Sequence, residues 1–265
     1  MNRTLLATVA IAALALASTG CDKLKARDNL NKGVQAFKGA KYQEATNFFL
    51  KSVELEPDNP NTHLYLATAY MSQYIPGAES DENNQMATNA EKGFRRVLEI
   101  DPQNELAIAS IASLKFNQKK FDEAVEWNKK LIAANPQNKD AYYTLGVIAW
   151  TNWLQPNREA RIKMNMKPED PGPLKDKKIR EELRDQYMAT LDEGIKNMAK
   201  ALEIDPEYDE AMAYMNLLIR YRADLLDTPE EYQKAVAVAD EWVQKALATK
   251  KMKAERQPVA GFTTE

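Results

Sequence analysis

The chain contains little of what most catalytic and metal sites are built from. Its 265 residues include a single cysteine, Cys21, and a single histidine, His63. One cysteine cannot form an intrachain disulfide, and one Cys with one His cannot supply the ligand cluster of a structural zinc site. The nine glycines form no phosphate-binding loop, and no nucleophile stands in a recognisable pattern with a base. We therefore expect a protein without enzymatic activity, cofactor or metal.

An excess of one charge and a long hydrophobic run are also missing. The chain has 36 basic and 39 acidic residues, a balance that argues against nucleic acid or a strongly anionic membrane as the principal partner. Its main apolar run, Leu5–Ala17, is 13 residues long, which is shorter than the ~20 residues that a transmembrane helix needs. Because Arg3 gives this run a basic start, residues 1–21 are predicted to be an export signal.

The run ends in Ser18-Thr19-Gly20-Cys21, which resembles the lipobox of bacterial lipoproteins, where cleavage precedes a cysteine that is then lipidated. Ser18 departs from the leucine that is usual three positions before the cysteine. The resemblance implies that Cys21 is acylated and that the exported chain is anchored in a bacterial cell envelope, facing the periplasm. The alternative is an ordinary secretory signal with an incidental cysteine. Whether the anchor lies in the inner or the outer membrane stays open, although Asp22 weakly favours the inner one.

Similar phrases recur around Pro57, Pro102, Pro136 and Pro206, at separations of 45, 34 and 70 residues. A small residue stands 12 positions before each proline, and a larger residue stands 8 before it. These pairs are Ala45 and Phe49, Ala90 and Phe94, Ala124 and Asn128, and Gly194 and Met198. The proline ends a helix because it lacks an N–H and biases its predecessor away from helical angles. The Asp, Asn or Gln that follows can help to start the next helix.

This pattern resembles the tetratricopeptide repeat, a pair of antiparallel helices with a period of about 34 residues. The resemblance implies an all-α, right-handed α-solenoid of about five helical hairpins within residues 22–249, the fifth formed by Asp209–Ile219 and Glu230–Leu247. His63 falls in a repeat position that faces its own hairpin, so we expect it to be a packed core residue rather than a base or ligand.

Two insertions lengthen the pattern, at about residues 71–84 and 152–178. Asp81 or Asn83 is expected to cap the helix that follows the first insertion. After the second, apolar residues at helical spacing predict a long helix from about Asp176 to Glu203. Trp153, Leu154, Met164 and Met166 of this insertion are expected to cover its apolar face. Residues 250–265 lack periodicity and are predicted to be a disordered tail.

The resemblance also implies a concave groove lined by the first helix of each hairpin. A candidate partner groove is then formed by Leu64, Met71, Phe116, Tyr143, Val147, Trp150 and Leu217. Some members of the family clamp a terminal carboxylate with a Lys and an Asn, and those places hold Leu30 and Val34 here. The groove is therefore apolar and aromatic. The alternative is that these side chains are interhelix core, or that the second insertion fills the groove.

The function that these features favour is a membrane-anchored scaffold for protein–protein interactions, which assembles or stabilises a cell-envelope complex. The alternative is a periplasmic carrier or chaperone-like protein that binds an extended peptide or apolar ligand in its groove. An open groove favours the carrier, and a groove filled by the insertion favours the scaffold. The sequence leaves open the partner protein, the oligomeric state, and whether the 152–178 insertion fills the groove or docks a partner.

Overall fold

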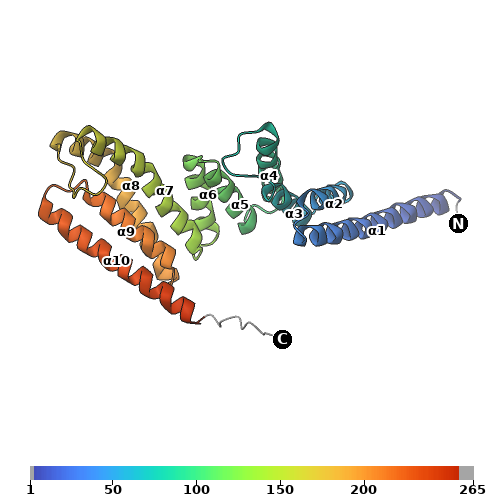
Figure 1. The fold of residues 1–265 in the computed structure, drawn as a ribbon. Coiled ribbons are helices and arrows are strands. Elements are labelled where there is room, and N and C mark those ends of the chain that lie inside the picture. Colours follow the sequence, from blue (N-terminus) through green and yellow to red (C-terminus); the bar gives the residue numbers. More distant parts are fainter. Residues whose placement is uncertain (1–2, 257–265) are drawn as a thin grey trace, which may run out of the picture. The chain divides into compact units, whose positions relative to one another are not determined.

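The structure, a computed structural model, describes residues 3–256, with side chains from Cys21 onward. This part of the chain consists of ten α-helices joined by loops and contains no strand, which confirms the all-α prediction (Figure 1). It divides into two compact units between Lys130 and Leu131, inside the sixth helix. The helices are α1 (Arg3–Lys38), α2 (Tyr42–Leu55), α3 (Pro60–Met71), α4 (Asp81–Ile100), α5 (Glu105–Asn117), α6 (Phe121–Ala134), α7 (Lys139–Lys163), α8 (Lys177–Ile204), α9 (Asp209–Ala223) and α10 (Pro229–Arg256).

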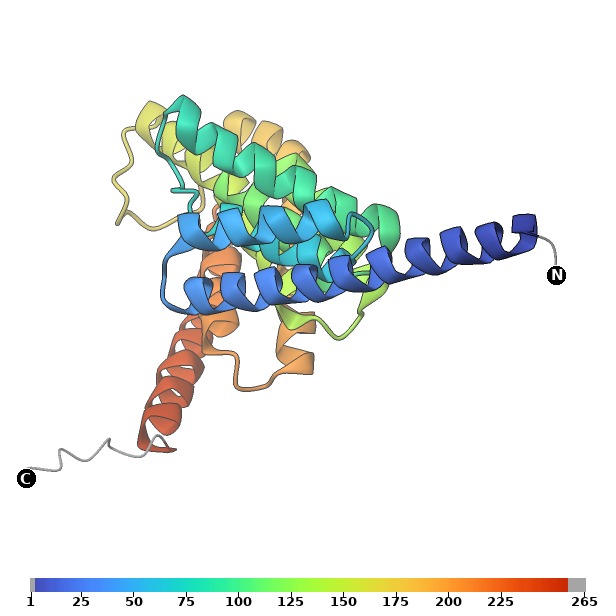
Figure 2. The ribbon, with the colours of Figure 1, turned by 90° about the vertical axis from the view of Figure 1, so that its right-hand side faces the viewer.

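The N-terminal unit is built from helices that pack against their neighbours in sequence: α1 on α2, α2 on α3, and α3 on α4. Figure 2 shows α1 and α2 as an antiparallel pair. Ala45, Phe49 and Ser52 form the buried face of α2, because residues four and three apart share one side of a helix. The Ser52 hydroxyl donates a hydrogen bond of 2.8 Å to the carbonyl of Ala26 in α1. This bond satisfies a polar group that the hairpin would otherwise bury without a partner.

The repeat positions read from the sequence are buried in both units. Ala45, Phe49, Ala90, Phe94, Ala124 and Met198 are fully buried, and Gly194 is buried with them. Asn128 departs from the apolar pattern yet is buried too, because its side-chain amide donates to the carbonyl of Ala124 one turn earlier. After three of the prolines, the next helix begins at an asparagine whose side chain accepts from a backbone N–H of the first turn; these N-caps are Asn59, Asn104 and Asn138.

The first insertion forms the loop between α3 and α4. Ser80, rather than the expected Asp81 or Asn83, caps α4 by accepting a hydrogen bond from the N–H of Asn83. The buried Asn83 side chain points back into the loop instead. It accepts from the N–H of Ile75 and donates to the carbonyls of Ile75 and Ala78. Asn83 is therefore the clip that holds this loop closed.

In the C-terminal unit, α7 packs against both α8 and α9, and α9 packs against α10. Asp176 caps α8 by accepting from the N–H of Ile179, so the long helix lies where the sequence placed it. The second insertion, expected at about residues 152–178, begins as a direct continuation of α7, which runs through Pro156 to Lys163. A proline inside a helix costs roughly 3 kcal/mol. Burial of Trp153, Asn157 and Ala160 on one face of the extension offsets this cost.

The second insertion, formed by the end of α7 and the loop 164–176, packs on the unit as the sequence indicated. The residues that it buries are only partly the ones expected. Trp153 is fully buried against Tyr187 of α8, with ring centres 5.1 Å apart, and Met166 is buried. Leu154 and Met164, also expected to cover α8, are only half-buried. The loop residue with the least exposure is Leu174, which the sequence pattern did not single out because it lies between turn residues.

The C-terminal end of the described chain is helical. Helix α10 reaches Arg256, so the predicted tail 250–265 is wrong over residues 250–256. Lys253 pairs with Asp209, and Arg256 pairs with Glu207, so tertiary ion pairs hold this last part of the helix. The remaining tail residues, 257–265, lie outside the described part.

At the other end, α1 runs from Arg3 through Cys21 to Lys38 without a break, and Cys21 is exposed. None of the described helices is both long enough and apolar enough to cross a membrane. The assignment of residues 1–21 to a lipoprotein signal stays a prediction.

Candidate functional site

The candidate site is a row of aromatic side chains between α7 and α9 of the C-terminal unit. Each helix contributes two rings seven residues apart, Tyr143 and Trp150 from α7 and Tyr214 and Tyr221 from α9. Seven residues are close to two helical turns, so both rings of a pair lie on one face of their helix. A fifth ring, Tyr208, comes from the residue just before α9.

The rings touch one another in an unbroken sequence. Tyr143 lies 5.1 Å from Tyr208 and 5.5 Å from Tyr214, measured between ring centres. Trp150 lies 5.6 Å from Tyr214 and 6.1 Å from Tyr221, nearly perpendicular to both. Edge-to-face pairs at these distances contribute about 0.5–1.5 kcal/mol each beyond the area they bury. All five rings are half-buried, so each one combines packing with some accessible surface.

Burial and nearby charges raise the pKa of two tyrosines of the row, Tyr143 and Tyr208. Burial raises the pKa of Tyr143 to about 12, and Tyr214 and Glu210 act in the same direction. Burial also raises the pKa of Tyr208, whose hydroxyl donates 2.9 Å to a carboxylate oxygen of Asp140. These two phenols are therefore uncharged at physiological pH.

Two polar features accompany the row. The indole N–H of Trp150 is buried and has no hydrogen-bond acceptor within the described residues. At the other end, the Lys139 ammonium lies 4.5 Å from the centre of the Tyr208 ring and pairs with Asp205. This position fits a cation–π contact, which stabilises the ring where the row begins.

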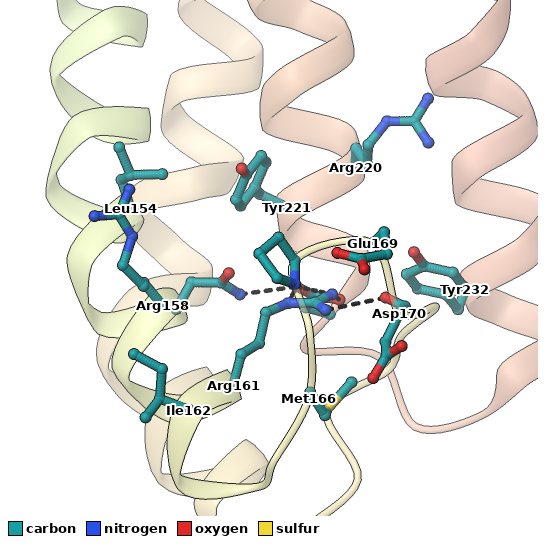
Figure 3. A pocket seen from close by; sticks show the side chains of 13 residues that line it. Leu154, Arg158, Arg161, Ile162, Met166, Glu169, Asp170, Arg220, Tyr221 and Tyr232 are labelled. Atoms are coloured by element: carbon teal, nitrogen blue, oxygen red, sulfur yellow. Dashed lines mark hydrogen bonds and ion pairs between the residues drawn. The ribbon is translucent and has the colours of Figure 1, made fainter.

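The row ends beside a cluster of polar groups centred on Asp224. This residue is buried, and its carboxylate accepts hydrogen bonds from Asn157 at 2.8 Å and from the Arg161 guanidinium at 2.8–3.2 Å (Figure 3). Arg161 also donates to the carbonyls of Lys167 and Asp170, and the Asp224 carbonyl accepts from the N–H of Leu174. The cluster therefore fastens the loop 164–176 to α7 and α9.

Arg161 and Asn157 stabilise the negative charge of the buried Asp224 carboxylate. Burial raises the pKa of Asp224, while Arg161 and Asn157 oppose that rise because they favour the ionised carboxylate. Gly172 of the loop lies so close that a Cβ there would stand 2.3 Å from an Asp224 oxygen and 2.6 Å from the Tyr232 ring. Glycine is needed at this position because no larger residue fits against the carboxylate.

The predicted groove residues have different environments. Tyr143 and Trp150 are brought together through Tyr214, as a shared face requires. Val147, between them in sequence, is only 7% exposed and contributes mainly to the core. Leu217 is half-buried in the same unit. Leu64, Met71 and Phe116 are half-buried in the N-terminal unit, where Phe116 packs 5.8 Å from Phe121.

Tyr208, Tyr214 and Tyr221 were not among the groove residues predicted from the sequence. The spacing of seven between Tyr214 and Tyr221, equal to that between Tyr143 and Trp150, was the signal that could have joined them. His63 is half-buried rather than fully packed in the core, and its Nε2 atom lies 2.7 Å from the carbonyl oxygen of Pro57, in the turn before its own helix. In the part of the chain that the structure describes, no three His, Cys, Asp or Glu side chains come together as a metal site.

No family model matches this chain. A curated relative, sperm-associated antigen 1 of Rattus norvegicus, is 30% identical over 117 residues. That match covers 44% of this chain but only 12% of the relative, so the chain corresponds to a small part of that protein.

Among solved structures, a crystal structure of MamA protein has a TM-score of 0.57 at 17% identity, over 89% of this chain and 98% of that one. MamA residues 41–end from Desulfovibrio magneticus RS-1 give the same TM-score and identity over 86% and 96%. YrrB, described as a TPR protein with an unusual peptide-binding site, has a TM-score of 0.52 at 14% identity over 84% and 90%. With the buried repeat positions and the asparagine caps, these likenesses show that the chain has the tetratricopeptide-repeat fold.

Proposed function

We propose that this protein is a lipid-anchored scaffold of a bacterial cell envelope that binds a protein partner on the aromatic row of its C-terminal unit. The observation that carries the proposal is the continuous series of five half-buried rings along α7 and α9. Tyrosine and tryptophan are enriched at the energetic centres of protein interfaces, because each has large contact area and few torsions to immobilise.

The structural relatives support a protein or peptide as the ligand. YrrB is described as having a peptide-binding site, and the fold shared with it places the first helices of successive hairpins, here α7 and α9, side by side. The row lies along this seam, so an extended segment or a helix could contact several rings at once.

The anchor is part of the same proposal and rests on the lipobox-like Ser18–Cys21. Cys21 is exposed and is the only cysteine of the chain, so no other thiol competes for acylation. After cleavage before Cys21, the chain would have 35 basic and 39 acidic residues, because the removed segment contains one arginine and no acid. We expect Cys21→Ser to abolish incorporation of labelled palmitate and to release the protein from membranes. Continued labelling of the variant would contradict the anchor.

The row is tested by Trp150→Ala with Tyr214→Ala, compared with Trp242→Ala as a matched control. Trp242 is a half-buried tryptophan of α10 outside the row, and its ring faces Lys245. If the row is the interface, the double variant should lose crosslinks to native envelope partners while its melting temperature stays near that of Trp242→Ala. Truncation of an interface anchor typically costs about 2 kcal/mol or more of binding, roughly 30-fold in affinity. Partners fully retained by a folded double variant would rule the row out.

A further inference from the structure

A cavity of about 630 Å³ opens at the end of the row, between the α7 extension, the loop 164–176 and the start of α10 (Figure 3). This volume lies in the range of pockets that hold small molecules or peptide side chains, about 300–1,000 Å³. Tyr221 belongs both to the aromatic row and to the wall of the cavity. The row and the cavity therefore share one side chain.

Six apolar or aromatic and seven polar or charged side chains line the cavity, and apolar atoms contribute the larger share of its accessible surface. Leu154 and Ile162 come from α7, Met166 and Pro168 from the loop, and Tyr232 from α10. Ile162 is 66% exposed. Burying such a side chain against a ligand is favourable, at about 25 cal/mol for each Å² of apolar surface removed from water. The cavity thus fits a bulky apolar side chain.

Most charges around the cavity already have partners. Arg161 is used by Asp224 and two carbonyls, and Arg220 pairs with Asp240. Asp170 accepts from the N–H of Lys167. Two exposed charges are different, because Arg158 and Glu169 have neither a hydrogen bond nor an ion pair within the described residues. They line opposite parts of the cavity, one on α7 and the other on the loop (Figure 3).

Arg158 has the better position of the two for holding a ligand. It lies eight residues after Trp150 and four after Leu154 on α7, so these three side chains share one face of a rigid helix. Glu169 lies in the loop, between proline and aspartate. A planar guanidinium pairs with a carboxylate through two parallel hydrogen bonds, and this geometry makes arginine the usual partner of acidic groups in recognition.

We propose that this cavity binds a peptide segment of the partner, with a bulky apolar side chain in the pocket and a neighbouring carboxylate on Arg158. The inference rests on the proposed function, because it adds the chemistry of the partner to the surface already assigned. The pocket is preformed, since Arg161, Asn157 and Asp224 hold the loop that makes one wall. A preformed site avoids the cost of ordering the loop on binding.

The test begins with the full chain and a phage-displayed library of random dodecapeptides. We expect the selected peptides to share a large apolar residue next to Asp or Glu. Two changes are then made in the tightest-binding peptide: the apolar residue to Ala, and the acid to its amide. Each should weaken binding by about tenfold or more, as expected for a lost apolar anchor and for a lost charge-assisted hydrogen bond.

The decisive measurement is a double-mutant cycle between Arg158→Ala in the protein and the acid-to-amide change in the peptide. If the two groups bind each other, Arg158→Ala costs about tenfold toward the acidic peptide and almost nothing toward the amide. Arg158 is exposed and unpaired, so this variant should fold normally. The exposed Arg95 of the N-terminal unit, which pairs with Glu91 and lies over the Trp127 ring, provides a control as Arg95→Ala and should leave peptide affinity unchanged.

Three results would overturn the inference: no shared motif, additive losses in the cycle, or a motif with Lys or Arg whose binding depends on Glu169→Gln. None of these results tests the proposed function, which is tested by whether the row variants lose their native partners. If Trp150→Ala with Tyr214→Ala loses those partners while Arg158→Ala binds selected peptides like the wild type, the scaffold stands and the pocket assignment falls. If the double variant keeps every partner, the scaffold interface falls even where the peptide cycle succeeds.

Discussion

The two insertion loops are held in place in different ways. Each lengthens one hairpin of the repeat, and each is held by one buried polar side chain. In the N-terminal unit, the neutral Asn83 makes three hydrogen bonds to loop backbone at most eight residues away. In the C-terminal unit, the charged Asp224 is bonded by Asn157 and Arg161, more than 60 residues away. The first clip is local, and the second joins two helices and a loop.

This difference has a functional consequence. A local clip closes a loop onto its own helix and leaves no cavity lined by distant segments. A long-range clip fastens the loop 164–176 to α7 and α9 at a fixed position, and the cavity beside Tyr221 lies among these three segments. Aromatic contacts differ in the same way. In the N-terminal unit, the rings described as touching form separate pairs such as Phe37 with Tyr42, whereas the C-terminal row is continuous.

The largest loss of stability is expected from a change at Arg161. Arg161→Ala leaves the buried Asp224 carboxylate without its cation, and such a loss typically destabilises a protein by about 3–5 kcal/mol. We expect a fall in unfolding free energy of about 3 kcal/mol in urea denaturation, together with faster proteolysis in the loop 164–176. Arg158→Ala, three residues earlier on the same helix, is the control and should stay within about 0.5 kcal/mol of the wild type. Equal stabilities for the two variants would show that the cluster does not hold the loop.

The two insertion glycines should respond to alanine for different reasons. Gly172→Ala places a methyl group against Asp224 and Tyr232, so we expect a loss of about 2 kcal/mol from overpacking. Gly77 has open space around its Cβ position but a φ of +81°, so Gly77→Ala should cost about 1 kcal/mol through backbone strain. Asn tolerates positive φ, so Gly77→Asn should recover stability while Gly172→Asn should not. Thermal melts of the four variants decide this, and recovery at both sites would refute the distinction.

The local clip should be weaker than the long-range one. Asn83→Ala removes three hydrogen bonds, but the loop is largely exposed and water can replace the missing partners. We expect a loss of about 1 kcal/mol, the size of a typical net hydrogen-bond contribution. Asn84→Ala, at an exposed neighbouring position, serves as the control. A loss for Asn83→Ala as large as that for Arg161→Ala would remove the contrast between the two clips.

The smallest expected effect is a pH dependence of folding stability. The turn after α9 is tied to α8 by Arg184, which donates to Asp227 and thereby lowers the pKa of that carboxyl. A lowered pKa in the folded state gives stability that is present above the ordinary pKa of aspartate, near 3.8, and lost as the pH falls through the lowered value. The stability difference between wild type and Asp227→Asn should therefore shrink as the pH is lowered from 7 to 3. The cost of Asn83→Ala should not change over that range, because Asn83 has no titrating group. A constant difference for Asp227→Asn would contradict the assignment.

Much of the fold could be read from the sequence because it is local. Proline after each second helix, small and large residues at fixed distances before it, and the apolar spacing of α8 all act within a few turns of chain. The continuation of α7 into the insertion could not be read from the sequence, for the opposite reason. Pro156 is a local stop signal, and only the burial of Trp153 and Ala160 against other helices overrides it. The end of α10 was misread in the same way, because its pairs with Glu207 and Asp209 join residues more than 40 positions apart.

By itself, then, the sequence determined the repeat, the hairpins, the place of both insertions and the aromatic character of α7. These properties follow from backbone propensities and helical periodicity, which neighbouring residues set. Only the tertiary structure decided that Tyr208, Tyr143, Tyr214, Trp150 and Tyr221 form one row, that Asp224 fastens a distant loop, and that Arg158 is left unpaired beside a cavity. Each of these depends on contacts between helices and loops far apart in the chain, and side-chain packing and buried charge pairing select those contacts only when the whole unit has folded.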